Sequence, residues 1–272
     1  MNEMHNILYP DLGNPLEDAS VLRNSIYFST PQRAYSAELI LQQPMNVNQR
    51  TLDFLVIRAF GEFMTSTEDL VGWFFILQEW QPGNAEYSLF YLLDKIKVGQ
   101  TGRYEEEQVV SLLSNLDGEG FRELLHIPTD DELLNSGYSK ELVDNIKRSM
   151  QSKLEGWLIF ARKRAEQGRG SVHMFNKIKH HMLAFPTRAR DKDEIWIPTH
   201  IKLNKEDNYI KLGQGWLESS ANNLRWLAGN AIAAQAILHD TLAAILTTRY
   251  NEKYTVPQWV LRAYQTDYLW QR

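Results

Sequence analysis

The sequence of 272 residues contains no cysteine. A disulfide framework, catalysis by a thiol and a cysteine-ligated zinc site are therefore excluded. The chain also lacks a glycine-rich phosphate loop, a Gly-x-Gly-x-x-Gly motif and a Gly-x-Ser-x-Gly motif, which mark common nucleotide-binding and hydrolase sites. The absence of cysteine fits a reducing compartment, and we expect a cytoplasmic protein.

A long, uncharged apolar segment is also missing. The two most apolar stretches, residues 54–80 and 224–246, are interrupted by charged and polar side chains. A membrane helix needs roughly 20 nearly uncharged residues. Residues 1–10 do not combine a basic start with an apolar run, so they do not resemble a signal peptide. We therefore expect a soluble protein without a membrane partner.

Apolar residues, by contrast, are plentiful and regularly spaced. They make up 43% of the chain, with 8 Trp, 12 Tyr and 11 Phe, which is enough to build a full core. In most long segments they recur at steps of three and four residues, which predicts an all-α, mostly helical fold. The expected helices cover residues 46–80, 87–98, 104–116, 120–125, 129–137, 140–167, 171–185 and 216–250, with a short helix after them.

Local signals mark the ends of several elements. Thr129 and Glu132 have the spacing of a capping box, so a helix should begin there. Gly168 and Gly170 should separate the helix before them from the one after them. Alternating polar and apolar residues predict a small β-hairpin near 194–213, in which Pro198 favours an edge strand.

Prolines set the expected domain division. Pro10, Pro15, Pro31 and Pro44 lie among scattered polar residues, and proline does not fit the interior of a helix. We expect residues 1–45 to form an extended N-terminal arm and residues 46–272 to form a single helical domain.

Three of the seven histidines occur within nine residues of one expected helix. Its apolar positions Phe175, Ile178, Met182 and Phe185 predict a stripe that faces the core. The polar positions then fall into two rows, because residues three or four apart are neighbours on a helix surface. The first row is Asn176 and His180, and the second is His173, Lys177 and His181. Lys179 adds a further cation, and no carboxylate lies on this helix.

This composition favours one kind of ligand over another. Metal sites usually combine histidines with carboxylates and avoid neighbouring lysines, so we expect no metal and no other cofactor. Lysines can hold a phosphate-bearing ligand such as RNA, and a histidine can transfer protons near neutral pH. The alternative is an ordinary polar helix face in contact with solvent.

Positive charge is concentrated in the part of the chain that contains this polar helix. Residues 140–190 contain 12 Lys and Arg against 4 Asp and Glu, a net charge of +8, whereas the rest of the chain has a net charge of −13. Such a segment is what an anionic partner would require. We therefore add Arg169 and Arg188 to Lys179, His181 and His173 as candidate anion-binding or RNA-binding residues.

The segment "NKIKH" at residues 176–180, on a helical background over about residues 50–250, resembles the HEPN superfamily of RNA-associated helical proteins. The resemblance implies a homodimeric, metal-independent ribonuclease of the toxin or antiviral-defence type. Its histidine would be His180, its polar position Asn176, and Lys177 would stand in for the arginine of that family. The family motif places an arginine four to six positions before the histidine, and this chain has none there.

Two functions remain open from the sequence. The chain is either a metal-independent endoribonuclease or RNA-binding factor with Asn176, Lys177 and His180 as its catalytic residues, or a catalytically inactive helical module that binds a protein partner. The pair His239-Asp240 also occurs in metal-dependent phosphohydrolases, but the further metal ligands of those enzymes are missing. We therefore expect His239 to pack inside the protein.

Overall fold

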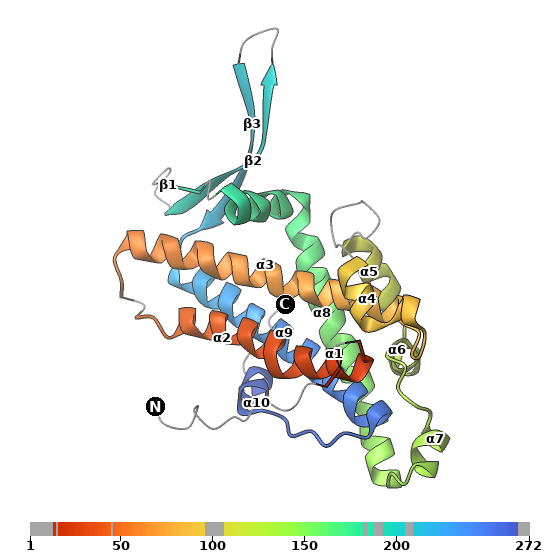
Figure 1. Cartoon of the computed structure of the whole chain (residues 1–272). Coiled ribbons are helices and arrows are strands. Elements are labelled where there is room, and N and C mark those ends of the chain that lie inside the picture. Colours follow the sequence, from red (N-terminus) through yellow and green to blue (C-terminus); the bar gives the residue numbers. More distant parts are fainter. Residues whose placement is uncertain are drawn as a thin grey trace.

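The computed structural model describes residues 13–14, 16–44, 46–95, 106–181, 184–187, 193–204 and 209–265. The described chain is helical apart from one three-stranded antiparallel sheet, as the apolar spacing predicts (Figure 1). The elements, in order, are α1 (Asp18–Asn24), the π-helical turn η2 (Ser25–Ser29), α2 (Thr30–Leu41), α3 (Gln49–Glu79), the 3-10 turn η3 (Ala85–Tyr87), α4 (Leu89–Lys95), α5 (Glu106–Ser114), α6 (Gly118–Leu124), α7 (Asp130–Asn135), α8 (Lys140–His181), β1 (Phe185–Thr187), β2 (Glu194–Asn204), β3 (Tyr209–Glu218), α9 (Ala221–Tyr250) and α10 (Gln258–Gln265).

The prediction of an extended arm for residues 1–45 is wrong for residues 18–41, which are helical throughout. Pro31 does not end the helix because it directly follows the π-helical turn. There, the backbone N–H and the hydroxyl of Thr30 both donate to the carbonyl of Ser25. The wider turn provides the local adjustment that a proline needs inside a helix. Residues from this segment, such as Leu22 and Ala37, are fully buried in the common core.

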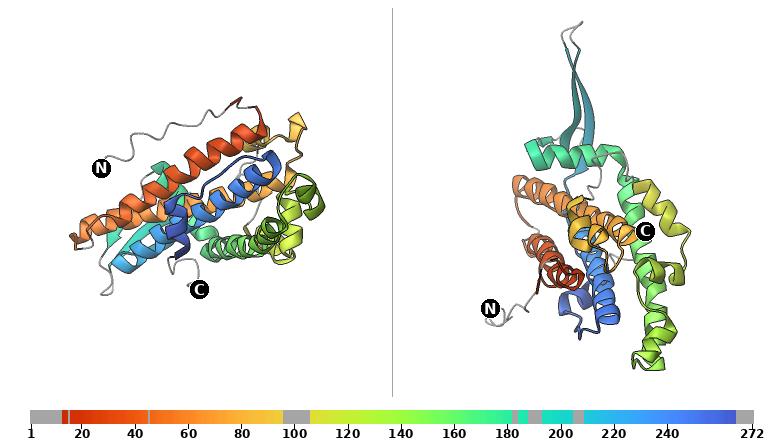
Figure 2. Two further views of the ribbon diagram at one scale, coloured as in Figure 1. Left: turned by 90° about the horizontal axis from the view of Figure 1, so that it is seen from below. Right: turned by 45° about the vertical axis from the view of Figure 1, so that its right-hand side comes forward.

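Apart from α8, the two longest helices are α3 and α9, and both cross the centre of the body. Asn48 caps α3, since its side chain accepts a hydrogen bond from the backbone N–H of Thr51 at 3.0 Å, and Ser220 caps α9 in the same way through Asn223 at 3.1 Å. Such caps satisfy backbone donors that a helix start leaves free. Figure 2 shows α2, α3 and α9 running side by side, and they are in direct contact.

Helix α9 is apolar on nearly all sides. By length and composition it could cross a membrane, since its most apolar stretch has a mean hydropathy of 1.3. However, 78% of that stretch is buried inside the body. Its alanines allow α2, α3 and α8 to pack around it.

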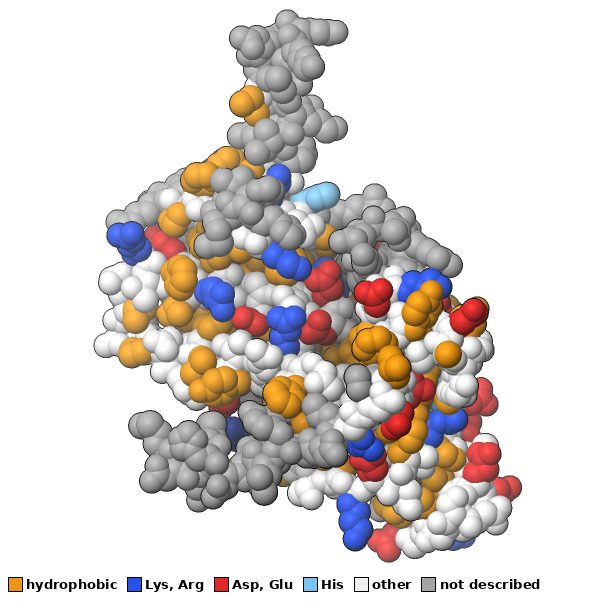
Figure 3. Space-filling model, viewed as in Figure 1, with side chains coloured by type: hydrophobic (Ala, Val, Ile, Leu, Met, Phe, Trp, Pro, Cys, Tyr) orange, Lys and Arg blue, Asp and Glu red, His pale blue; other side chains and the backbone are white. Residues whose placement is uncertain are grey.

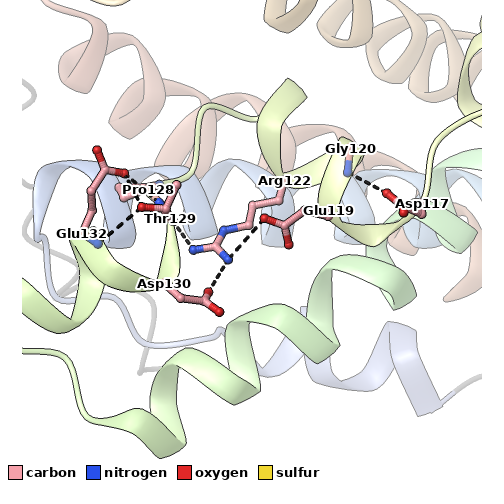
Figure 4. A network of polar contacts seen from close by, with 8 residues as sticks. All are labelled: Asp117, Glu119, Gly120, Arg122, Pro128, Thr129, Asp130 and Glu132. Atoms are coloured by element: carbon pink, nitrogen blue, oxygen red, sulfur yellow. Dashed lines mark hydrogen bonds and ion pairs between the residues drawn. The ribbon is translucent and has the colours of Figure 1, made fainter.

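The corner between α6 and α7 is built from polar side chains (Figure 4). The predicted capping box is confirmed: Thr129 Oγ1 accepts from the backbone N–H of Glu132, and the Glu132 carboxylate accepts from that of Thr129. Beside it the buried guanidinium of Arg122 contacts the Asp130 carboxylate and donates to the carbonyl of Pro128. These polar contacts add to the buried apolar side chains of Leu125 and Ile127, which join the same corner to the core.

The predicted break at 168–170 is also wrong, because α8 continues through it as one helix of 42 residues. Two glycines weaken a helix without necessarily ending it. Figure 1 shows instead that α8 changes direction before its last part, which lies against the sheet. Further back, Gly156 allows α8 to approach α9 closely, since a Cβ there would lie 2.6 Å from Cδ1 of Ile237.

The predicted hairpin is present as β2 and β3, and its distal part projects away from the helices (Figures 1 and 2). The sheet order β1-β2-β3 makes β2 the central strand, so the edge position predicted for Pro198 is wrong for the strand as a whole. In the described pairing, however, β1 reaches only residues 194–196 of β2, and the β2–β3 register shifts between Pro198 and Ile201. A proline is tolerated where a strand lacks a neighbour or bulges.

Two large apolar clusters form most of the core, and a small third cluster joins α9 to α10. The larger joins α1, the second half of α3, α4 to α6, the middle of α8 and the second half of α9. The smaller joins α2, the first half of α3, the end of α8, the sheet and the first half of α9. The sheet therefore covers one end of the helical body, and the end of α8 lies there with it.

Candidate functional site

The C-terminal part of α8, which carries the candidate residues, is fixed by its apolar side. Met174, Phe175 and Ile178 are buried against the sheet in one cluster with Ile195 and Leu217. The core-facing stripe is thus confirmed for Phe175 and Ile178. Phe185, predicted to extend this stripe, lies instead in strand β1 with 46% of its surface exposed.

The polar side of this part of α8 faces solvent. His173, Asn176 and Lys179 are exposed, and Lys177 is half-buried. The ammonium of Lys179 lies 5.5 Å from the centre of the Phe175 ring. The side chains of Arg169, His180 and His181, and all of Arg188, lie outside the described residues. The pairing of Asn176 with His180 therefore stays a prediction.

Three cations of the basic segment are not available to a partner, because they are buried. Lys153 pairs with Asp240, its Nζ lying 2.6 Å from the carboxylate. Lys163 donates to the side chain of Asn230 at 2.7 Å, and burial lowers the pKa of its ammonium. Arg164 lies inside the core, where it donates to the carbonyl of Met64 at 3.4 Å.

The exposed cations of the same segment are spread along α8. Lys140, Lys147 and Arg148 lie near its start, Arg162 lies in the middle, and Lys179 lies near its end. Measured along its axis, which changes direction before the last part (Figure 1), a helix of this length is roughly 60 Å long at 1.5 Å per residue. On the face drawn in Figure 3, basic side chains are interspersed with acidic ones. The described cations of residues 140–190 do not form one compact surface.

The interior position expected for His239 is confirmed. Its Nδ1 lies 2.8 Å from the hydroxyl of Thr30, its Nε2 contacts the hydroxyl of Tyr254, and the Trp259 ring packs against it at a steep angle of 75°. Burial lowers the pKa of the imidazole to about 4. Among the described residues, no group of three or more His, Asp and Glu could hold a metal ion.

A cavity of about 620 Å³ opens beside α1, in the part of the body that the larger cluster holds. Three of the four charged residues that line it, Asp18, Arg23 and Glu252, have partners within the protein. Arg23 contacts Glu252 at 2.6 Å, and Asp18 accepts from the indole of Trp80 and the backbone of Leu89, both at 2.8 Å. These pairs link α1 to α4 and to the end of α9, so we assign the cavity a structural role.

The outer face of the sheet shows an arrangement that the sequence analysis missed. Alternate residues of a strand point to opposite faces. Ile195 and Leu217 face inward, and Trp196 and Trp216, which are directly opposite each other, therefore face outward. Phe185 pairs with Trp196 from the other side, with 5.2 Å between the ring centres.

These three rings form one row across all three strands, and we call the outer face of the sheet around this row the aromatic face. Trp216 is 45% exposed, Phe185 is similarly exposed, and Trp196 is half-buried. Gly215 keeps the opposite side tight, because a Cβ there would overlap the sulfur of Met174. At the base of the sheet the inner side is thus filled, while the outer side has open aromatic surface. Figure 3 shows hydrophobic side chains at the base of the hairpin.

Two carboxylates flank the rings on the aromatic face. Glu194 and Glu218 are directly opposite each other, one alternation away from the tryptophan pair. Like charges in this position repel each other. Neither carboxylate forms an ion pair with any cation of the described chain. The sequence signal that could have revealed this face is that each tryptophan is adjacent in the strand to a residue of the inward set, Trp196 to Ile195 and Trp216 to Leu217.

No family model, curated protein or solved structure matches the chain. The resemblance to the HEPN superfamily therefore rests on residues 176–180 and on the helical character of the chain. The structure shows the helical character, while the ribonuclease activity, the RNA ligand and the homodimer stay predictions.

Proposed function

We propose that this protein is a non-catalytic helical module that binds a protein partner on the aromatic face. The observation that carries the proposal is the open row of Phe185, Trp196 and Trp216 at the base of the sheet, where the other side packs on the helices. Large aromatic side chains contribute much of the energy of protein interfaces when a partner covers them. The sheet is fixed to α8 through Met174 and Phe175, so the rings are held in place before binding.

The distribution of charge favours this function over RNA binding as the main activity. Glu194 and Glu218 lie on the aromatic face and would repel phosphates. Lys153, Lys163 and Arg164 are buried and do not contribute to an anion-binding surface. The aromatic rings alone could stack on bases, but the adjacent carboxylates oppose that use.

Affinity purification from the source cells tests this function. The wild-type protein and Trp216→Ala serve as baits, with Phe90→Ala as a control, because Phe90 is equally exposed on α4, away from the sheet. We expect a partner protein to be enriched with wild type and Phe90→Ala and lost with Trp216→Ala. Identical sets of proteins from all three baits would contradict the proposal.

RNA binding at the end of α8 is a second candidate, supported by the shared exposure of His173, Asn176 and Lys179. If it occurs, binding should weaken steeply with salt, since contacts with phosphates release counterions. The reversal Lys177→Glu with Lys179→Glu should reduce binding far more than Lys140→Glu with Lys147→Glu at the other end of the helix. Equal effects of the two reversals would exclude a local site.

The catalytic form of this second candidate depends on His180. A general acid or base contributes roughly 10²–10⁴-fold to a proton-transfer step. His180→Ala should therefore abolish cleavage of total RNA, and EDTA should leave cleavage by the wild type unchanged. Cleavage that survives His180→Ala would exclude the role of His180.

A further inference from the structure

The aromatic face combines two features that select the charge of its partner. The indoles of Trp196 and Trp216 offer flat π surfaces, and Glu194 and Glu218 place two negative charges beside them. Ammonium and guanidinium groups bind over aromatic faces, most strongly over tryptophan. They also form charge-assisted hydrogen bonds with carboxylates. A cationic side chain can therefore satisfy both features at once.

The opposed carboxylates add a reason for binding that the rings do not supply. Cross-strand neighbours have Cβ atoms about 5 Å apart, and like charges at this separation destabilise the pair. A cation placed between Glu194 and Glu218 removes this repulsion. Among the described residues no cation pairs with either carboxylate, so a cationic side chain of a partner would relieve the repulsion between them.

We infer that the partner of the aromatic face is a basic segment of another protein, with arginine or lysine side chains seated on Trp196 and Trp216 between Glu194 and Glu218. This inference rests on the proposed function and specifies its partner. Arginine should bind more tightly than lysine, because its planar guanidinium stacks on indole and can contact two carboxylate oxygens.

The partner is not the same face of a second copy. Two such faces brought together would place four carboxylates near one another without a cation, and like-charge contacts across an interface are unfavourable. A single strand of RNA would bring phosphates to the same carboxylates. Charge complementarity therefore distinguishes a basic segment from both other occupants.

Fluorescence anisotropy of labelled peptides with the full-length protein tests the inference. The probes are four short peptides of equal length in which serine alternates with arginine, lysine, glutamine or glutamate, together with a labelled single-stranded RNA. We expect the arginine peptide to bind most tightly, followed by the lysine peptide. The glutamine and glutamate peptides should bind weakly or not at all.

Variants of the protein assign the binding to residues. Glu194→Lys with Glu218→Lys should weaken binding of the arginine peptide at least about tenfold, because it replaces two attractions by two repulsions. Trp216→Ala should weaken it about fivefold or more, as expected for an anchor residue. The control Glu86→Lys with Glu123→Lys makes the same change in net charge at exposed positions elsewhere, and should alter binding by less than about twofold. Thermal denaturation verifies that each variant is folded.

The possible outcomes separate this inference from the proposed function. Equal effects of the two double reversals, or tighter binding of RNA than of the arginine peptide, overturn the basic partner. If the glutamine peptide binds as well as the arginine peptide and Trp216→Ala abolishes both, the basic partner is overturned while binding at the aromatic face stands. If Trp216→Ala changes no binding, both fail. Self-association that Trp216→Ala abolishes would identify a second copy as the occupant and overturn the inference.

Discussion

The interior around α9 and the lobe at the sheet end of α8 contain the same kinds of side chain in opposite settings. In the interior, Trp157 donates its indole N–H to Thr241 at 3.0 Å and is fully buried. Lys153 pairs with Asp240 there, and His239 is enclosed by its own hydrogen-bond partners.

In the lobe, the corresponding residues face solvent. Trp216 belongs to the open aromatic face, and His173 and Lys179 lie on the polar side of α8. The comparison teaches that residue type does not decide whether a tryptophan, histidine or lysine stabilises the fold or is available to a partner. Its place among elements that are distant in the sequence decides this, and three matched pairs of substitutions test the distinction.

The largest difference in the effect on stability should be between substitutions of the two tryptophans, Trp157 and Trp216. Trp157→Ala should lower the free energy of unfolding by about 4 kcal/mol, because it leaves a cavity in the core. Trp216→Ala should change it by less than about 0.5 kcal/mol, the usual range for a surface position. Urea denaturation measures both values. A large decrease in the free energy of unfolding of Trp216→Ala would mean that the aromatic face is needed for folding. The proposed difference between the two tryptophans would then be wrong.

The histidine pair should differ in the pH dependence of stability. The pKa of His239 is lowered to about 4, mainly by burial and against the attraction of Asp240. In the unfolded chain a histidine has a pKa of about 6.5. Between these values the unfolded state binds more protons, so the free energy of unfolding decreases as pH falls from 6.5 to 4. This contribution amounts to at most about 3 kcal/mol.

His239→Gln should remove this contribution, and His173→Gln should retain it because His239 is still present. Asp69 acts in the opposite direction, since burial raises its pKa to about 6 and its contribution to stability is lost as pH rises from about 4 to 6. Each variant is therefore compared with wild type at every pH, so that the effect of Asp69 cancels. Parallel curves for wild type and His239→Gln would show that His239 does not titrate in this window.

The lysine pair should show the smallest difference. Lys153→Met should lower the free energy of unfolding by about 2 kcal/mol, because it leaves Asp240 without its cation. The loss is less than for a fully enclosed pair, since about a quarter of the Asp240 side chain is exposed. Lys179→Met should change stability by less than about 0.5 kcal/mol. Similar midpoints in urea for the two variants would show that the Lys153–Asp240 pair adds little.

The parts of the fold that depend on neighbouring residues could be predicted from the sequence. The capping box of Thr129 and Glu132, the hairpin near 194–213 and the apolar stripe through Phe175 and Ile178 are all present. Each follows from spacing within a few residues, because helix caps and strand alternation are local geometry.

The errors occurred where a local signal was overridden. Pro31 lies inside a helix because the π-helical turn before it accommodates the ring. Gly168 and Gly170 did not end α8. The part of α8 before the glycines packs on the larger core cluster, and the part after them packs on the smaller one. Trp216, expected at the start of a helix, lies in β3 because its strand pairs with β2.

The candidate site was predictable only in part. The exposure of His173, Asn176 and Lys179 follows from the stripe that places their neighbours in the core. The aromatic face did not emerge, because it exists only once β1, β2 and β3 are in register. The basic segment was overestimated, since sequence charge does not show which cations other helices enclose.

The sequence by itself determined the helical class, most helix ends, the hairpin and the polar side of the end of α8, because those features depend on residues within one or two turns. Only the tertiary structure decided which cations are buried, which histidine is enclosed and which face of the sheet stays open. Thr30 and His239, for example, are 209 residues apart and share a hydrogen bond of 2.8 Å. Contacts of this kind arise when separate helices pack around a common core, and spacing along the chain does not encode them.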